Sequence, residues 1–320
     1  MSILITGATG FIGHALSLHL ESHNYSIRRT FRPHFSSKYE SLIKSDSVAI
    51  DDINANTDWT AALSGINCVI HCAARAHVMN DTEFKVLNTY RSINVEGTRH
   101  LAEQAAANGV TRFIFLSSIK VNGERTSGAL RFTRNDRAQP EDPYAVSKWE
   151  AEQVLHEISA RTGLDLVIIR PPLVYGHGVK GNLARMVNLV RSGLPLPFGA
   201  INNQRSLIGI DNLLDLLQRC VEHPQAPGNT FLASDGEDLS TPELLARMAK
   251  AMHRSSCLFP MPLSILRIIA KAAGKASEID RLVGSLRIDD SDTREILDWL
   301  PPISIDAGIY KMINFEKKDS

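Results

Sequence analysis

Short apolar runs alternate with longer helical patterns through the first half of the chain. Between the runs, apolar side chains recur every three or four residues, as at Ile12, Leu16 and Leu20, and this spacing predicts helices. Strands that alternate with helices form a parallel sheet with right-handed crossovers. The pattern therefore predicts an α/β fold with a doubly wound parallel sheet, whose strands we place at 2–6, 25–30, 47–50, 68–72, 113–116 and 166–170.

The alternation is interrupted at Leu173, which indicates a second unit. Residues 181–192 have a helical pattern, and the chain from 233 onward is mainly helical. We expect a strand at 206–210 and the helix after it to return to the first sheet. The prediction is a larger domain formed by 1–172 with 206–232, and a smaller, mostly helical domain formed by 173–205 with 233–320.

The first predicted strand ends in a glycine-rich turn, and a helical pattern follows it. Gly7 permits a tight turn, Gly10 lets the backbone approach a pyrophosphate, and Gly13 lets the helix pack close to the sheet. Unpaired N–H groups at the helix N-terminus can bind phosphate. The turn, which also contains Thr9, Phe11 and Ile12, is a candidate dinucleotide-binding loop; the alternative is a purely structural turn.

The ends of the other predicted strands bear on the choice of cofactor. An NAD site usually has an Asp or Glu after the second strand, whereas this chain has Phe31 and Arg32, preceded by Arg28 and Arg29. Cations there suit the 2′-phosphate of NADP, so we expect NADP(H); NAD(H) with solvated arginines is the alternative. Ligands bind beyond the carboxyl ends of parallel strands. The further cofactor contacts expected there are Asp52, Ile53, Ala73, Ala74 and Pro171.

A Tyr-x-x-x-Lys spacing, from Tyr144 to Lys148, follows Pro143 at the start of a predicted helix. Residues four apart share one helix face, so the phenol and the ammonium would lie together. A cation beside a phenol favours the phenolate and makes the group usable as an acid or base nearer neutral pH. The spacing alone also fits an ordinary surface helix. His71, at the end of the fourth strand, is better explained as a packed strand residue than as a catalyst.

Composition narrows the class of protein. The 320 residues include 35 Lys+Arg and 35 Asp+Glu without a basic, aromatic-rich run, which argues against a nucleic-acid partner. The four cysteines form no Cys-x-x-Cys pair, so we expect no metal site and no disulfide framework, as in a reducing cytoplasm. Met1-Ser2 leads into a strand without a signal peptide. The apolar stretch 259–274 is too short to span a bilayer and is interpreted as a core-packing helix, with interfacial membrane contact as the alternative.

Five motifs occur in order along the chain: Gly7-x-x-Gly10-x-x-Gly13, Asn94-x-x-Gly97-Thr98, Ser117-Ser118-x-x-x-x-Gly123, Tyr144-x-x-x-Lys148 and Arg170-Pro171-Pro172-x-x-Tyr175-Gly176. Together they resemble the extended short-chain dehydrogenase/reductases that act on nucleotide sugars. The resemblance implies a Rossmann-type fold in which Tyr144 is the acid/base and Ser118 orients the substrate oxygen. It also implies that Lys148 binds the nicotinamide ribose and lowers the pKa of the tyrosine, and that Asn94 is structural.

One departure from the family pattern bears on the reaction. The 4,6-dehydratases of this family have Thr-Asp-Glu where this chain has Ser118-Ile119-Lys120. Elimination of water needs an acid and a base beyond the tyrosine, which Ile119 and Lys120 do not supply. A C4 epimerase or a 4-keto reductase remains. The ending Thr30-Phe31-Arg32 resembles NADP-using members rather than epimerases whose second strand ends in Asp.

A closer resemblance, through 71–79, 117–123 and 234–240, is to bacterial enzymes of surface-polysaccharide synthesis. Those enzymes reduce UDP-2-acetamido-2,6-dideoxy-xylo-hexos-4-ulose to UDP-N-acetylquinovosamine or UDP-N-acetylfucosamine, and many relatives are named UDP-glucose 4-epimerases. The resemblance implies an NAD(P)-dependent 4-keto-sugar reductase. A UDP-sugar 4-epimerase is the nearer alternative, and a non-catalytic dinucleotide-sensing regulator is the more distant one.

The resemblance also implies contacts with a UDP-sugar. Asn182 and Arg205 match residues that contact the diphosphate, and Arg281 is a second candidate clamp. Arg75 and His77, just past the fourth strand, either face the sugar or are solvated; Asn182 could instead be a helix N-cap. Family members commonly dimerise through two helices that correspond here to 82–107 and 144–161, so we expect a homodimer.

Overall fold

The computed structural model describes residues 1–33, 46–76 and 83–314. In these residues, seven parallel strands form the large sheet, in the order β3-β2-β1-β4-β5-β6-β9. Their bounds are β1 Ser2–Thr6, β2 Ser26–Phe31, β3 Ser47–Ala49, β4 Cys68–His71, β5 Arg112–Leu116, β6 Asp165–Arg170 and β9 Thr230–Leu232. The doubly wound parallel sheet predicted from the hydrophobic pattern is confirmed.

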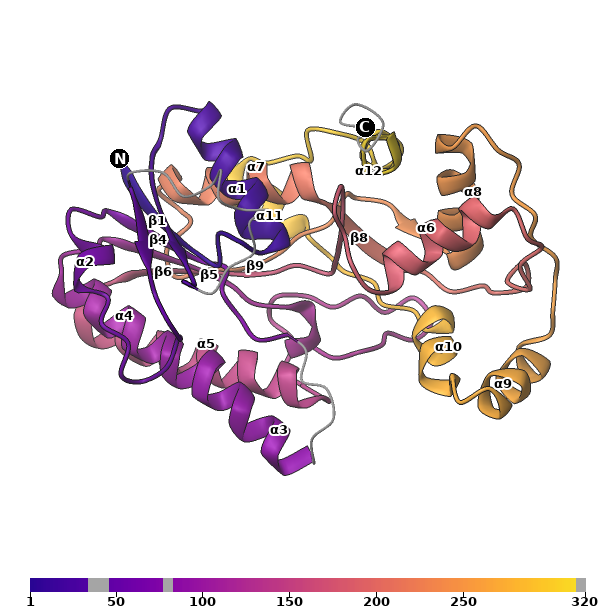
Figure 1. The fold of residues 1–320 in the computed structure, drawn as a ribbon, viewed down its shortest axis with the longest axis horizontal. Coiled ribbons are helices and arrows are strands. Elements are labelled where there is room, and N and C mark those ends of the chain that lie inside the picture. The colour runs from indigo at the N-terminus through magenta and orange to yellow at the C-terminus, as the bar shows by residue number, and fades with distance from the viewer. Residues whose placement is uncertain (34–45, 77–82, 315–320) are drawn as a thin grey trace.

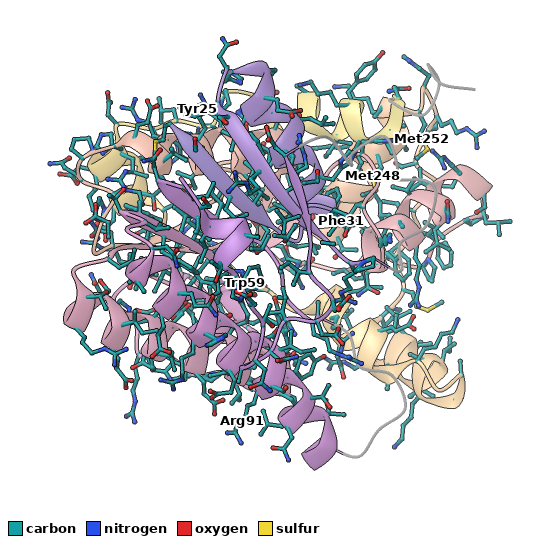
Figure 2. All side chains as sticks on the ribbon, turned by 60° about the vertical axis from the view of Figure 1, so that its left-hand side comes forward. Tyr25, Phe31, Trp59, Arg91, Met248 and Met252 are labelled. Atoms are coloured by element: carbon teal, nitrogen blue, oxygen red, sulfur yellow. The ribbon has the colours of Figure 1, made fainter. Side chains whose placement is uncertain are left out.

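Helices cover both faces of the large sheet (Figure 1). One face carries α1 (Phe11–Ser22), α7 (Ile210–Glu222) and α11 (Ser291–Leu297); the other carries α2 (Thr60–Leu63), α4 (Gly97–Ala107) and α5 (Pro143–Thr162). Because strand side chains alternate between faces, Ile3 joins the first core and Leu4 the second. Trp59, labelled in Figure 2, is fully buried in the second core.

A continuous helical stretch follows β4. It consists of α3 (Glu83–Tyr90), a π-helical turn (Arg91–Glu96) and α4. From the π turn, buried Asn94 accepts from the Arg75 backbone N–H at 2.8 Å and donates to the Ser147 hydroxyl at 3.0 Å. Asn94 thus joins the segment after β4 to α5, which supports the structural role expected for it.

A small second sheet contains β7 (Leu173–Tyr175), β8 (Arg205–Gly209) and β10 (Asp238–Leu239), with β8 in the middle. The prediction that the strand near 206–210 returns to the large sheet is therefore wrong. A buried strand has the same apolar pattern whichever sheet it joins, so the sequence did not distinguish the two pairings. The helix after this strand, α7, does pack on the large sheet.

The remaining helices, α6 (Asn182–Ser192), α8 (Thr241–Ala251), α9 (Leu263–Ala272), α10 (Ala276–Val283) and α12 (Ile305–Asn314), lie on the side of the small sheet. The helix predicted within 259–274 exists as α9, and it buries Leu266 and Ala270. Its opposite face exposes Ile265, Ile268 and Ile269, so the core-packing interpretation is correct for one face and wrong for the other. Within the described ranges, no helix has the length and apolar character needed to cross a bilayer.

Candidate active site

The glycine-rich turn lies between β1 and the N-terminus of α1, as predicted. Gly7 has φ +69°, and a Cβ there would lie 2.8 Å from the backbone N and Cα of Ala73. A Cβ at Gly13 would lie 2.3 Å from the Gly7 carbonyl oxygen. The turn therefore packs directly against the end of β4 and the start of α1. Bare backbone beside the N–H groups at the start of α1 fits a pyrophosphate, and Ala73 lies next to it.

The arginines around β2 have different environments. The Arg28 guanidinium donates to the Ser64 carbonyl at 2.6 Å, and buried Arg29 pairs with Glu21 at 2.6 Å. The expectation that these two cations help to bind a 2′-phosphate is therefore not supported, because each is engaged by its own neighbours. Arg32 is exposed just past β2, and Figure 2 shows Phe31 at that strand end.

Two further cofactor candidates follow β3. The Asp52 side chain is exposed, while its backbone carbonyl accepts from the Thr57 hydroxyl at 2.6 Å. Ile53 packs on α4, where a Cβ at Gly97 would lie 2.6 Å from its Cγ2. The glycine of the Asn94-x-x-Gly97-Thr98 motif thus lets the segment after β3 approach this helix.

His71 is a packed strand residue, as expected. Its two ring nitrogens hydrogen-bond the hydroxyls of Thr6 and Thr98 at 2.7 and 2.9 Å. Complete burial, with Lys148 as a second cause, lowers the pKa of His71 to about 3. The ring is therefore neutral at physiological pH and bridges β1 and α4.

The start of α5 positions the predicted acid/base pair. Asp142 caps the helix by accepting from the Ala145 N–H at 2.7 Å, and Pro143 occupies the first turn. Tyr144 stands edge-on to Tyr90, with ring centroids 6.0 Å apart. One turn later, the buried Lys148 ammonium lies 3.8 Å from the centroid of the Phe115 ring.

The pKa values of this pair differ from the expectation. Burial raises the pKa of Tyr144 to about 12, and the charges of Asp142 and Tyr90 act in the same direction. Burial lowers the pKa of Lys148 to about 7 despite the opposing effects of Glu152 and Cys72. The expected lowering of the tyrosine pKa by Lys148 is not found, because burial disfavours the charged form of both groups. At neutral pH Tyr144 is a phenol that can donate a proton.

The structure separates the two serines after β5. Ser117 is buried and donates to the Glu152 carboxylate of α5. Ser118 is half-buried, and its hydroxyl oxygen accepts from the Lys120 N–H at 3.3 Å. The Ile119 N–H donates to the Pro171 carbonyl at 3.0 Å, which joins this segment to the end of β6. This arrangement supports Ser118 rather than Ser117 as the residue available to a substrate.

Sequence reasoning missed two charged clusters beside these serines. The Lys120 ammonium pairs with Glu124 at 2.8 Å and with Asp142, the cap of α5. Buried Glu152 accepts from the Arg170 guanidinium at 3.0 Å. The Asp-Pro pair at 142–143 was a helix-start signal that could have placed Asp142. Because Lys120 is engaged by two carboxylates, it is not an available base, which agrees with the rejection of dehydratase chemistry.

The predicted substrate residues are only partly brought together. The Arg205 guanidinium donates to the Arg281 and Gly284 carbonyls at 2.7 and 3.2 Å, so the two candidate clamps are neighbours. Burial lowers the pKa of Arg205 and the charge of Glu124 raises it, which places Arg205 near the cluster around Lys120. The Arg281 side chain is exposed.

The structure does not bring the other three candidate substrate residues together. Asn182 is the first residue of α6 after the cap Gly181, so the N-cap alternative for Asn182 is wrong. Arg75 is exposed, with its backbone held by Asn94. His77 lies outside the described residues.

A doubly wound parallel sheet with a glycine-rich turn at the end of β1 and a Tyr–Lys pair on α5 is typical of a dinucleotide-binding α/β protein. The model of the NAD dependent epimerase/dehydratase family matches residues 3–233. The chain therefore belongs to this family of enzymes, and the family resemblance drawn from its motifs is confirmed.

Individual relatives agree with this assignment. The chain is 45% identical to a UDP-glucose 4-epimerase of Vibrio cholerae over 310 residues, 96% of this chain and 93% of the relative. It is 25% identical over 339 residues to the N-acetyl-alpha-D-glucosaminyl-diphospho-ditrans,octacis-undecaprenol 4-epimerase of Escherichia coli O157:H7, covering 99% and 97%. Among solved structures, UDP-glucuronic acid 4-epimerase from Bacillus cereus in complex with NAD has a TM-score of 0.78 at 22% identity, covering 99% and 97%. This last likeness supports the fold.

Proposed function

We propose that the protein transfers a hydride between a nicotinamide dinucleotide and C4 of a UDP-sugar. Tyr144 donates the proton to the oxygen at C4, Ser118 hydrogen-bonds that oxygen, and Lys148 binds the nicotinamide ribose. The observation that carries the proposal is the placement of Tyr144 and Lys148 one turn apart on α5, with the Ser118 segment tied to the same helix. The cofactor supplies the hydride, and the protein supplies the proton and the orientation.

The net reaction that we propose is reduction of the 4-keto group of a UDP-2-acetamido-2,6-dideoxy-hexos-4-ulose, in bacterial surface-polysaccharide synthesis. A reductase releases its oxidised cofactor after each transfer, which suits NADP(H). Support for NADP(H) comes from the end of β2, where Phe31 and exposed Arg32 stand in place of a carboxylate. Arg32 would pair with the 2′-phosphate.

A UDP-sugar 4-epimerase is the second candidate, and a specific observation favours it. The Vibrio cholerae relative, at 45% identity over nearly the whole chain, is named a UDP-glucose 4-epimerase. An epimerase would use the same three side chains but retain NAD and let the sugar turn over within the pocket. The family assignment and the intact Ser118, Tyr144 and Lys148 both favour an enzyme over a dinucleotide-sensing regulator.

The proposal assigns the two ligands to different parts of the fold. The dinucleotide would bind over the large sheet and the UDP group on the side of the small sheet, which β8 joins although the sequence prediction gave 206–232 to the first domain. Arg205, which lies near the Lys120 cluster, is the diphosphate contact that we propose, although its guanidinium also donates to the Arg281 and Gly284 carbonyls. Homodimerisation through α3, α4 and α5 stays a prediction; these helices lie side by side on one face of the sheet (Figure 1).

The test is to titrate NADPH and NADH against the wild-type protein and Tyr144→Phe, and to assay nucleotide bound to the freshly purified wild type. We expect empty wild-type protein that prefers NADPH and consumes it in step with a UDP-4-keto-sugar. Tyr144→Phe should bind NADPH within about twofold of wild type and lose turnover by about 10²–10⁴.

Each other outcome has a defined meaning. Wild-type protein that retains NAD after purification and interconverts UDP-glucose without net cofactor consumption would establish the epimerase instead of the reductase. A Tyr144→Phe variant with appreciable turnover would show that Tyr144 is not the acid. NADPH binding without turnover of either class of UDP-sugar would contradict C4 chemistry altogether.

A further inference from the structure

One face of α9 is apolar and exposed. Ile265, Ile268 and Ile269 are 47%, 69% and 52% exposed, and their spacing places them on a single helix face. Phe259, 40% exposed, precedes the helix. Single exposed apolar residues are common on protein surfaces, whereas a contiguous group of this kind marks an interaction surface. We call the three isoleucine side chains the α9 stripe.

The segment that contains the α9 stripe is basic, although Glu278 and Asp280 of α10 follow it directly. Residues 244–277 contain six Lys or Arg and no Asp or Glu, in a chain whose overall formal charge is zero. Lys271 and Lys275, at the end of α9 and just past it, are exposed. Arg267 pairs with Asp280 of α10 at 3.5 Å, which leaves the two lysines as the more available cations beside the stripe.

The position of α9 makes this surface accessible. α9 and α10 form the end of the molecule that is remote from the large sheet (Figure 1). The buried face of α9, Leu266 and Ala270, attaches it to the rest of the protein, with Leu266 in the small-sheet core. The helix can therefore present the α9 stripe outward without rearrangement of the fold.

We propose that the α9 stripe docks on the surface of an anionic phospholipid bilayer. The isoleucines would enter the boundary between headgroups and acyl chains, while Lys271 and Lys275 contact lipid phosphates. Ten residues are too few to cross a bilayer, so α9 lies in the plane of the surface.

The experiment is flotation of the full-length protein with phosphatidylcholine vesicles, with and without phosphatidylglycerol. Wild-type protein should float with the anionic vesicles. Replacing the three isoleucines together by Ser, or both lysines by Glu, should lower the bound fraction by about tenfold or more. The matched apolar control is Leu130→Ser with Leu300→Ser, since these residues are 67% and 69% exposed elsewhere on the protein. The matched charge control is Arg137→Glu with Lys180→Glu.

Three results would overturn the proposal. The first is wild-type protein that does not float with anionic vesicles. The second is an equal loss of binding in the control variants, which would indicate non-specific adhesion. The third is a fall in sedimentation mass for the isoleucine variant, which would identify the α9 stripe as a contact between two copies. Unchanged circular dichroism and melting temperature confirm that each variant is folded.

Discussion

Lys148 is the residue whose environment differs most from what its spacing suggests. Its ammonium is buried over the Phe115 ring. Glu152, one turn further along α5, directs its carboxylate to Ser117 and Arg170 instead. The lysine therefore has a nearby negative charge without a direct ion pair, and burial dominates its pKa. At neutral pH it exchanges readily between the charged and neutral forms.

Because Lys148 is buried, we predict that it lowers the free energy of unfolding by an amount that depends on pH. The pKa is about 7 in the folded protein against 10.5 for an ordinary lysine, so between these pH values the unfolded chain binds more protons. The free energy of unfolding of wild type should then rise with pH by up to about 1.4 kcal/mol per unit relative to Lys148→Met. The advantage of the methionine variant is largest below pH 7 and shrinks toward pH 10.

Urea unfolding of both proteins, from near pH 6 to near pH 9.5, measures this difference. Below the folded pKa, Lys148 is charged in both states and the difference between variants should be constant. A difference that stays flat across the whole range would show that Lys148 keeps an ordinary pKa.

At the residue scale, the sequence predicted which residues form the candidate site better than it predicted their pKa values. The i, i+4 spacing placed Tyr144 and Lys148 on one helix face. The family resemblance, in which the serine lies five residues before the glycine matching Gly123, distinguished Ser118 from Ser117. The sequence did not predict that Lys148 would be buried and Tyr144 half-buried. The burial arises because Phe115 of β5 and Tyr90 of α3 pack against α5. These contacts join residues that are far apart in the chain, so a local pattern does not reveal them.

In the turn between β1 and α1, two separate constraints require glycine at position 7. Gly7 has a positive φ, which a side chain disfavours, and it also touches the backbone of Ala73 at the end of β4. Gly65 has nearly the same φ, +71°, with no atom within 4 Å of an added Cβ. Comparing the two separates the backbone strain from the close approach.

Gly7→Ala should destabilise the protein by about 1–3 kcal/mol more than Gly65→Ala, because overpacking adds to the shared cost of positive φ. Gly7→Ala should also weaken dinucleotide binding, whereas Gly65→Ala should leave it unchanged. Denaturant unfolding and cofactor titration of both variants measure these effects. Equal destabilisation by the two changes would mean that the turn can shift away from β4.

At the element scale, local pattern gave the first six strands of the large sheet close to their observed bounds, but it missed the short strands β7, β9 and β10. The exceptions depend on partners. β8 has the apolar pattern of a buried strand, but it pairs with β7 and β10, a choice that its own residues do not encode. The apolar stretch 259–274 predicted a core-packing helix, yet which of the apolar residues of α9 are covered depends on the elements that pack on one side of it.

At the scale of the whole molecule, the fold brings together three segments that are far apart in the sequence. The Thr126 N–H donates to the Ser285 carbonyl at 2.9 Å, and the Leu286 N–H donates to the Gln204 carbonyl at 2.9 Å. The segment between Ser118 and α5 is thereby joined to the chain after α10 and to the start of β8. This junction places Arg205 on the same side of the molecule as the Lys120 cluster.

Arg205 lies between the small-sheet side, where we propose that the UDP group binds, and the segment that carries Ser118 and Lys120. Removing its guanidinium in Arg205→Ala should raise KM for the UDP-sugar by about tenfold or more, since charged hydrogen bonds contribute about 1.5–3 kcal/mol. kcat and NADPH affinity should change little, because the proposal places Arg205 at the diphosphate of the UDP-sugar and away from both C4 and the dinucleotide. Arg205→Lys keeps the charge without the planar fork and should be intermediate. Arg185→Ala, at an exposed ion pair on α6, is the control. If Arg205→Ala only lowers the melting temperature, its bonds to the Arg281 and Gly284 carbonyls are its whole role.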